Sequence, residues 1–316
     1  MSTDSKSKAS RPWAPHLALL AVQVLFGTWP IIGKIVLRTV SSSSLVVYRL
    51  VGAALVFALI QRRLRPLRRM PAKDFRWLVL CSAMGIIGNQ LLYLKGLSLT
   101  TVINTTLLNT TMPAFTLFVS ILFGYDRLSL RRVMGILLAA TGVIYLVNPL
   151  RADLSHETTV GNLLIVGNSL LYSAYIVASK DLFERYGALN VITWLFLLSA
   201  ILAIPIGIYS ITHEDLVNVS LKVWLLIALI ILLPTVGAYY LNSWALVKVS
   251  PSTVAVYIYL QPLIAFGVTP FLLGETWSWR TVVAAALIFS GVAIVTKRGR
   301  SQAVREISEH PDALAH

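Results

Sequence analysis

The sequence predicts an all-α polytopic membrane protein with ten transmembrane helices, arranged as two inverted five-helix repeats. Three observations predict this fold: a series of long apolar stretches, the placement of the basic residues, and a pattern of rare residue types that occurs twice. The 316 residues are 57% hydrophobic and only 13% charged, which is too apolar for a soluble fold of ordinary composition. The mean hydropathy of +0.76 agrees with the membrane class.

The apolar stretches are long enough to cross about 30 Å of hydrocarbon, and they recur along nearly the whole chain. Short polar segments separate them, so each stretch is expected to form one helix. The expected helices cover residues 17–37, 45–60, 77–94, 102–123, 133–147, 161–179, 191–209, 221–243, 252–273 and 281–296.

The basic residues set the expected orientation. Twenty lysines and arginines fall in segments on the same side as the N-terminus and six fall on the other side, which predicts that both termini are cytoplasmic. Residues 1–16 then form a cytoplasmic N-terminal segment and residues 298–316 a cytoplasmic tail. Because topology explains the net charge of +14, no nucleic acid partner is expected. The basic segment between the second and third stretches also suits anionic membrane lipid headgroups.

Glycines, prolines and charged residues of the first half of the chain recur at matched positions in the second half. At an offset of 149 residues the matched pairs are Gly88 and Gly237, Pro113 and Pro262, Asp126 and Glu275, Arg131 and Arg280, and Gly142 and Gly291. Two units of similar length follow, residues 17–150 and 151–297. Each unit holds five crossings, an odd number, so the second unit is expected to enter the membrane from the opposite side. Asp126 is therefore expected on the cytoplasmic side and Glu275 on the other side.

Four segments carry a resemblance to a known family. The two units close on FGYDRLSLRRVMGILLAATGVIYLV and LLGETWSWRTVVAAALIFSGVAIVT, which follow GLSLTTVINTTLLNTTMPAFTLF and ALVKVSPSTVAVYIYLQPLIAF. These segments resemble the EamA-like family of the drug/metabolite transporter superfamily, and the resemblance extends from Trp13 to Arg298. It implies ten helices, a place in the bacterial inner membrane and, commonly, export of amino acids or other metabolites. The first unit departs from the family's Gly-Glu pair, because it reads Gly124-Tyr125-Asp126.

Polar and aromatic side chains inside the apolar stretches are the candidates for a solute-binding cavity. An unsatisfied amide or hydroxyl in hydrocarbon costs several kcal/mol, so these side chains are expected to face the interior of the helix bundle. Bonding between helices is the alternative for each residue taken alone. The substrate-binding candidates are Gln23, Trp29, Asn89, Tyr93, Asn109, Asn168, Tyr172, Tyr239, Asn242, Tyr257 and Gln261. The same stretches also contain Gln90, Asn104, Tyr240 and Tyr259.

Two prolines and one arginine stand out within the stretches. Pro113 and Pro262 occupy matched positions in the middle of their stretches, where a proline removes a backbone hydrogen bond and weakens the helix. They are candidate gating hinges, with static kinks as the alternative. Arg49 is expected about one turn inside the second helix, with its side chain reaching to the interface. The resemblance implies a structural or gating role for Arg49, and binding of a substrate carboxylate is the other interpretation.

The remaining residues argue against other classes of protein. The acidic residues and the histidines all fall in loops, tails or helix ends, so neither a metal site nor a catalytic cluster is expected, and the chain is not expected to be an enzyme. The segment GTWPIIGK has the wrong spacing for a phosphate-binding loop, and no cofactor is expected. Small residues on the fifth and tenth stretches suit close packing, either within one chain or in a homodimer.

A carrier of small solutes by alternating access is therefore the leading hypothesis, with export favoured by the resemblance. A membrane-embedded enzyme, or a protein that handles lipid headgroups without solute transport, is the alternative.

Overall fold

The computed structural model describes residues 13–61, 70–124, 129–147, 157–214, 219–249 and 251–296. All regular structure in these residues is helical, and seven helical paths are long and apolar enough to cross a membrane. Two shorter apolar helices accompany them. The predicted class, an all-helical integral membrane protein, is thus confirmed.

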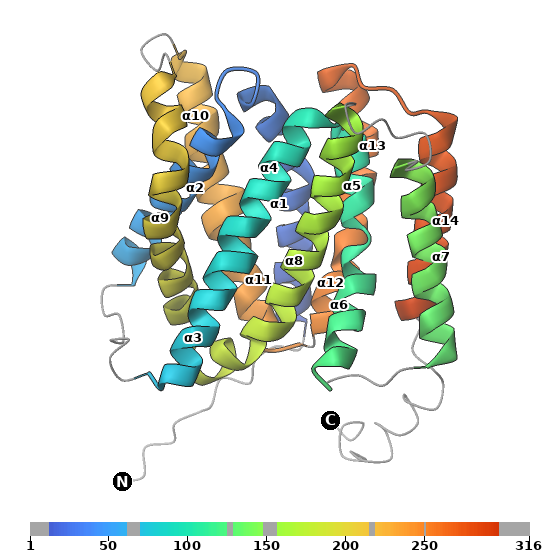
Figure 1. Ribbon diagram of the computed structural model, residues 1–316, viewed down its shortest axis with the longest axis horizontal. Coiled ribbons are helices and arrows are strands. Elements are labelled where there is room, and N and C mark those ends of the chain that lie inside the picture. The colour runs from blue at the N-terminus through green and yellow to red at the C-terminus, as the bar shows by residue number, and fades with distance from the viewer. Residues whose placement is uncertain are drawn as a thin grey trace.

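The described residues up to 186 form nine helical elements, eight in the first half of the chain and α8 in the second, and they make one bundle with the elements that follow (Figure 1). They are α1 (Ala14–Val36), α2 (Ser42–Ile60), α3 (Ala72–Cys81), the π-helical η2 (Ser82–Gly88), α4 (Asn89–Leu99), α5 (Val102–Asn109), α6 (Met112–Leu122), α7 (Leu130–Val147) and α8 (Glu157–Tyr186). The second half continues with α9 (Ala188–His213), α10 (Leu221–Ile230), the π-helical η4 (Ile231–Gly237), α11 (Ala238–Leu246), α12 (Pro251–Val256), the 3₁₀ segment η5 (Tyr257–Tyr259), α13 (Leu260–Leu273) and α14 (Trp279–Thr296).

Several helix boundaries follow from local capping. The Ser41 hydroxyl accepts the amide N–H of Ser44 before α2, and the Thr101 hydroxyl accepts that of Asn104 before α5, as N-cap residues do. Only Gly187 separates α8 from α9, and its φ of 82° is one that a residue with a side chain rarely adopts.

Two expected helices are interrupted rather than continuous. The expected helix 102–123 is interrupted by a turn at Thr110 and Thr111, between α5 and α6, and in 252–273 the 3₁₀ turn η5 separates α12 from α13. Pro113 and Pro262 therefore lie in the first turns of α6 and α13, where a missing N–H costs little, and each is still near the middle of its expected stretch. At the first break the Thr110 hydroxyl donates to the carbonyl oxygen of Leu107 at 2.6 Å, so the interrupted backbone is satisfied within the protein.

The element bounds of the second half repeat those of the first at the offset of 149 residues. Both ends match in three pairs of elements, which are α3 with α10, η2 with η4, and α7 with α14. The two π-helical segments matter most, because such segments are rare and generally occur where a helix serves a particular site.

Contacts at the helix ends fix the directions of these elements. Arg185, in the last turn of α8, pairs with Asp74 in the first turn of α3 at 3.1 Å, and we call this the Asp74 end of the bundle. The path Ala72–Leu99 is helical throughout, so α4 finishes at the opposite end, beside Thr100, which we call the Thr100 end. There the Lys34 ammonium donates to the carbonyl oxygen of Thr100 at 2.6 Å.

The path Leu221–Leu246 runs the other way. It finishes where Lys180, near the end of α8, donates to the carbonyl oxygen of Leu246 at 3.2 Å. That contact lies at the Asp74 end, so α10 begins at the Thr100 end while its counterpart α3 begins at the Asp74 end.

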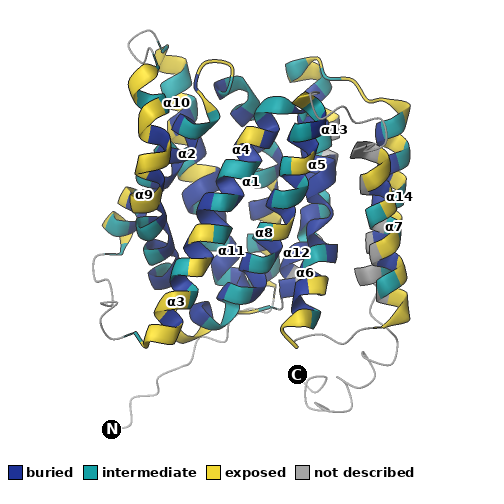
Figure 2. Ribbon diagram, viewed as in Figure 1, coloured by how far each residue is buried: buried dark blue, intermediate teal, exposed yellow. Residues whose placement is uncertain are grey.

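Burial distinguishes the interior of the bundle from its rim. Buried residues face the middle of the bundle, and exposed ones gather on its outer helices (Figure 2). Many of the exposed side chains are large and apolar, such as Leu59 and Phe271, as a lipid-facing surface requires. Helices α7 and α14 pack as a pair at one edge (Figure 1), with Gly142 close to the carbonyl oxygen of Ala284. These small residues therefore serve packing within the chain.

Candidate functional site

A pocket lies in the middle of the bundle and is lined by both halves of the chain. Helices α1, α2, α4, α5 and α6 contribute from the first half, and α8, α11, α12, η5 and α13 from the second. The centre of a water molecule can occupy about 60 Å³ of it, whereas a single buried water needs roughly 10–15 Å³ by the same measure. The pocket thus has room for a small solute or for several waters.

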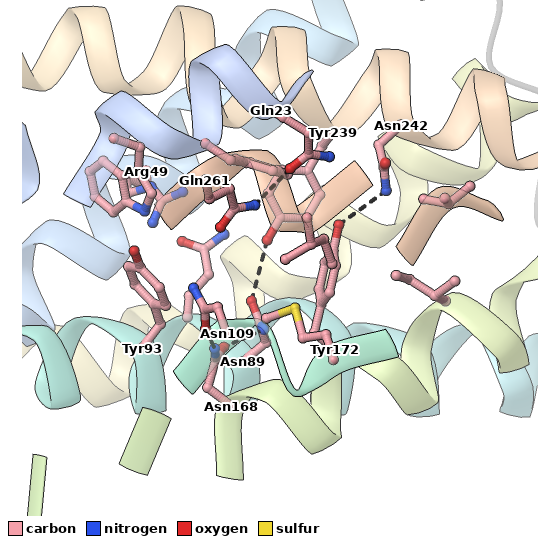
Figure 3. Close-up of a pocket in the computed structure, with 17 residues that line it drawn as sticks. Gln23, Arg49, Asn89, Tyr93, Asn109, Asn168, Tyr172, Tyr239, Asn242 and Gln261 are labelled. Carbon is pink, nitrogen blue, oxygen red and sulfur yellow. Dashed lines mark hydrogen bonds between the residues drawn. The ribbon is translucent and has the colours of Figure 1, made fainter. Parts of the chain in front are cut away.

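Ten of the eleven predicted cavity residues line this pocket (Figure 3). They are Gln23, Trp29, Asn89, Tyr93, Asn109, Asn168, Tyr172, Tyr239, Asn242 and Gln261. The structure thus brings the predicted residues together, and a role for them in binding a substrate stays a prediction.

A chain of amides crosses the pocket wall from one half to the other. The Asn89 amide donates to Asn168 Oδ1 at 2.5 Å, and the Asn168 amide donates to Asn109 Oδ1 at 3.3 Å. The Tyr239 hydroxyl donates to Asn89 Oδ1 at 3.3 Å. The consecutive helices α4 and α5 of the first half are thereby joined to α8 and α11 of the second half beside Asn109.

Two further hydrogen bonds link helices across the pocket. The Gln261 amide donates to Gln23 Oε1 at 2.7 Å, and the Asn242 amide donates to the Tyr172 hydroxyl at 3.0 Å. Each pair is buried, so each amide gains a partner that lipid could not supply.

Arg49 also lines the pocket, and this corrects the expectation that its side chain reaches the interface. Its side chain is only 3% exposed. The guanidinium lies 4.1 Å from the centre of the Trp29 ring, and Nε donates to the Thr235 hydroxyl at 3.0 Å. Thr235 belongs to the π-helical η4, so that distortion positions a partner for the arginine. Figure 3 shows Arg49 beside Tyr93 at one end of the pocket, with Asn242 at the other.

Tyr257 is the predicted cavity residue that does not line the pocket. Its hydroxyl bonds to His16 Nδ1 at 2.7 Å instead. The rule that a polar group in a span needs a partner still holds for Tyr257, but the partner is at the start of α1.

Sequence reasoning did not single out Gln90 as a binding residue, although it placed Gln90 inside a span. Gln90 is 1% exposed and lines the pocket. Among the described residues, neither atom of its amide group makes a hydrogen bond of normal geometry, although the Tyr239 hydroxyl lies beside it. Five apolar residues complete the lining, and nothing in the sequence distinguished them from other apolar residues of the spans. They are Phe26, Met112, Ile176, Val254 and Ile258.

Charged side chains other than Arg49 lie toward the ends of the described helices. Glu275 accepts the backbone N–H groups of Val102 and Ile103 at 3.0 and 3.2 Å, capping α5 at the Thr100 end. Lys34 and Lys180 cap α4 and α11 at opposite ends. Asp126, the predicted counterpart of Glu275, lies outside the described residues.

Comparisons with known proteins bear on this arrangement. A model of the EamA-like transporter family matches the chain twice, over residues 13–148 and 159–297. An uncharacterized transporter of Archaeoglobus fulgidus is 26% identical, covering 90% of this chain and 97% of that protein. A WAT1-related protein of Arabidopsis thaliana is 25% identical over 94% of this chain and 86% of its own length. The uncharacterized inner membrane transporter YhbE of Escherichia coli K12 is 25% identical, with coverages of 78% and 77%.

A crystal structure of a protein shares the fold. It matches with a TM-score of 0.61 at 19% identity, over 90% of this chain and 98% of that chain.

Proposed function

Because this chain belongs to the EamA-like transporter family, as its segments indicated, we propose that it carries small amphipathic metabolites, a class that includes amino acids, across the bacterial inner membrane by alternating access. The direction we propose is export. The single observation that carries the proposal is the polar pocket in the middle of the bundle, which both halves of the chain line.

The proposal requires two five-helix units that lie upside down relative to each other. The matched bounds of α3 with α10, of η2 with η4 and of α7 with α14 support a duplication. The opposite directions of α3 and α10, inferred from the contacts at the Asp74 and Thr100 ends, support the inversion. Inverted units give a carrier two conformations of similar energy, since exchanging the conformations of the units moves the opening from one side to the other.

The interrupted helices are where we place the movement. Helices α5 and α6 meet at a break beside Asn109, and α12 meets α13 at η5, and both junctions contribute residues to the pocket. Pro113 and Pro262 follow the breaks and leave the backbone there without N–H donors that would extend the helix. A solute bound at the junctions then contacts the parts of both units that bend.

Counterflow in sealed vesicles tests the function. Purified protein in liposomes loaded with one unlabelled compound is expected to accumulate the same labelled compound, with amino acids, nucleobases, polyamines and small monocarboxylates as the panel. Accumulation that requires the protein supports a carrier, and no accumulation of any panel member by well-folded protein would count against it.

The orientation has its own test at two matched lysines. Lys73 and Lys222 are exposed residues in the first turns of α3 and α10. In a background where the buried Cys81 is replaced by alanine, we expect K222C to react with an impermeant maleimide in intact cells. We expect K73C to react only after permeabilisation. If both positions react from one side of the membrane, the inverted arrangement is wrong.

A further inference from the structure

The chemistry of the pocket has one feature that the proposed function leaves open, which is the charge of the solute. Among the described residues that line the pocket, Arg49 is the one with a formal charge. Within the part of the chain that the structure describes, no carboxylate pairs with it, and its hydrogen bond to Thr235 uses only Nε. Both terminal nitrogens of the guanidinium therefore have no acceptor among these residues.

The position of Arg49 makes such an unpaired cation costly. Arg49 is the eighth residue of α2 counted from Ser42, which puts it about 10 Å below the Thr100 end of the bundle at 1.5 Å per residue. A buried charge without a counter-charge is unfavourable, and the ring of Trp29 offsets only part of that cost. A ligand that brings one negative charge would neutralise the site.

Gln90 gives a second, independent indication of a ligand. Its amide is buried and makes no hydrogen bond of normal geometry within the described residues, whereas the neighbouring amides of Asn89, Asn168 and Gln261 are paired. The Tyr239 hydroxyl lies beside it but donates to Asn89. Buried polar groups are normally satisfied, and a bound solute with polar atoms would satisfy this one. Arg49 and Gln90 line the same pocket, so a bound solute meets a guanidinium, which suits a carboxylate, and an amide that can bond a further polar atom.

From this geometry we infer that the pocket takes a monocarboxylate with an aliphatic or aromatic body and without a positively charged group. This inference rests on the proposed function and narrows its solute class. A dianionic phosphate would leave one negative charge unpaired. A zwitterionic amino acid would bring an ammonium group into a pocket whose described lining residues include no carboxylate. The aromatic side chains of Phe26, Tyr172 and Tyr239 supply the wall for the apolar body.

Three compounds with the same phenylethyl body test the inference by their charge alone. They are 3-phenylpropanoate, phenylalanine and 2-phenylethylamine, with hexanoate as an aliphatic carboxylate. We expect purified wild-type protein to bind labelled 3-phenylpropanoate, and unlabelled hexanoate to compete. Phenylalanine and 2-phenylethylamine are expected to compete at least about tenfold more weakly, since each lacks the net charge that pairs with Arg49. Equal or stronger competition by either of them, or no binding of either carboxylate, overturns the inference.

Variants tie the binding to Arg49. The change R49M is expected to weaken carboxylate binding about tenfold or more, and R49K to retain part of it, because lysine keeps the charge and loses the planar fork. R38Q is the control. Arg38 is an exposed cation two residues after the last residue of α1, at the Thr100 end of the bundle. Unchanged binding in R49M, or an equal loss in R38Q, overturns the inference. If R49M does not fold, R49K and the wild-type selectivity decide it.

Failure of the carrier proposal would look different. Carboxylate binding that depends on Arg49, without flux in vesicles, would overturn alternating access and leave the binding inference standing. Flux of phenylalanine with no binding of either carboxylate would overturn the binding inference and leave the carrier proposal standing.

Discussion

The contact of Glu275 with α5 gives a quantitative prediction for the alternating-access proposal. Glu275 follows α13 in the second half of the chain, and its two carboxylate oxygens accept the first N–H groups of α5 in the first half. This joins two walls of the pocket at the Thr100 end. We expect the contact to hold that end closed, so that E275A favours the conformation open there.

The size of the effect follows from the number and type of bonds lost. Removing an N-cap acceptor costs about 0.5–2 kcal/mol, and hydrogen bonds to a charged group contribute roughly 1.5–3 kcal/mol. The bonds are only partly buried, so we take the lower part of these ranges, about 1–2 kcal/mol. Since 1.4 kcal/mol is a factor of ten, the open population is expected to rise about five- to thirtyfold.

The modification rate of a cysteine in the pocket measures that population. Met112 lines the pocket, and M112C in a C81A background can be labelled by an impermeant maleimide added from the Thr100 side. While the open conformation is the minor one, the labelling rate follows its population. We therefore expect E275A to raise the rate about five- to thirtyfold.

A second glutamate provides the matched control. Glu214 accepts the Ser41 N–H and the Ser44 hydroxyl, both at 2.9 Å, at the start of α2. It makes the same kind of contact at the same end, but α2 and α9 are packed along their length and do not meet at the α5–α13 junction. If E214A accelerates labelling as much as E275A, or E275A leaves the rate unchanged, the proposed closure at Glu275 is refuted.

Three further predictions concern the hinge, the packing and the amide network. P113A supplies an N–H that can extend α6 backward across the break, so we expect slower counterflow with unchanged binding affinity, whereas P205A on the exposed face of α9 should alter neither. G161A places a Cβ about 3 Å from the backbone of α4, so its melting temperature in detergent should fall by several degrees, whereas G267A, with open space around it, should melt like the wild type. N168A removes the middle of the amide chain and should cost about 1–3 kcal/mol, seen as a lower melting temperature that N168D does not fully restore.

Much of the pocket was predictable from the sequence, because hydrocarbon imposes a simple requirement. A polar side chain in a span must find a partner inside the protein, so residues such as Asn89, Asn168 and Gln261 were expected to face inward. The requirement does not say where the partner is. Tyr257 meets it by bonding His16 away from the pocket, and nothing in the local sequence distinguishes it from Tyr239, which lines the pocket.

The chain's repeat determined which positions meet, but not their chemistry. At the offset of 149 residues Gln90 corresponds to Tyr239 and Tyr93 to Asn242, and all four line the pocket. Positions related by this offset thus contribute different side chains to the same pocket.

Hydropathy, charge placement and the repeat are properties of the chain taken in order, so the sequence by itself determined the membrane class, the expected spans and most of the polar residues that line the pocket. The tertiary structure decided how each helix is rotated and where it breaks. Rotation of α2 turned Arg49 inward onto Trp29, and the distortion in η4 brought Thr235 to it. Which side of a helix faces the bundle depends on the neighbours that pack against it, and these include residues far along the chain, such as Thr235, 186 positions from Arg49.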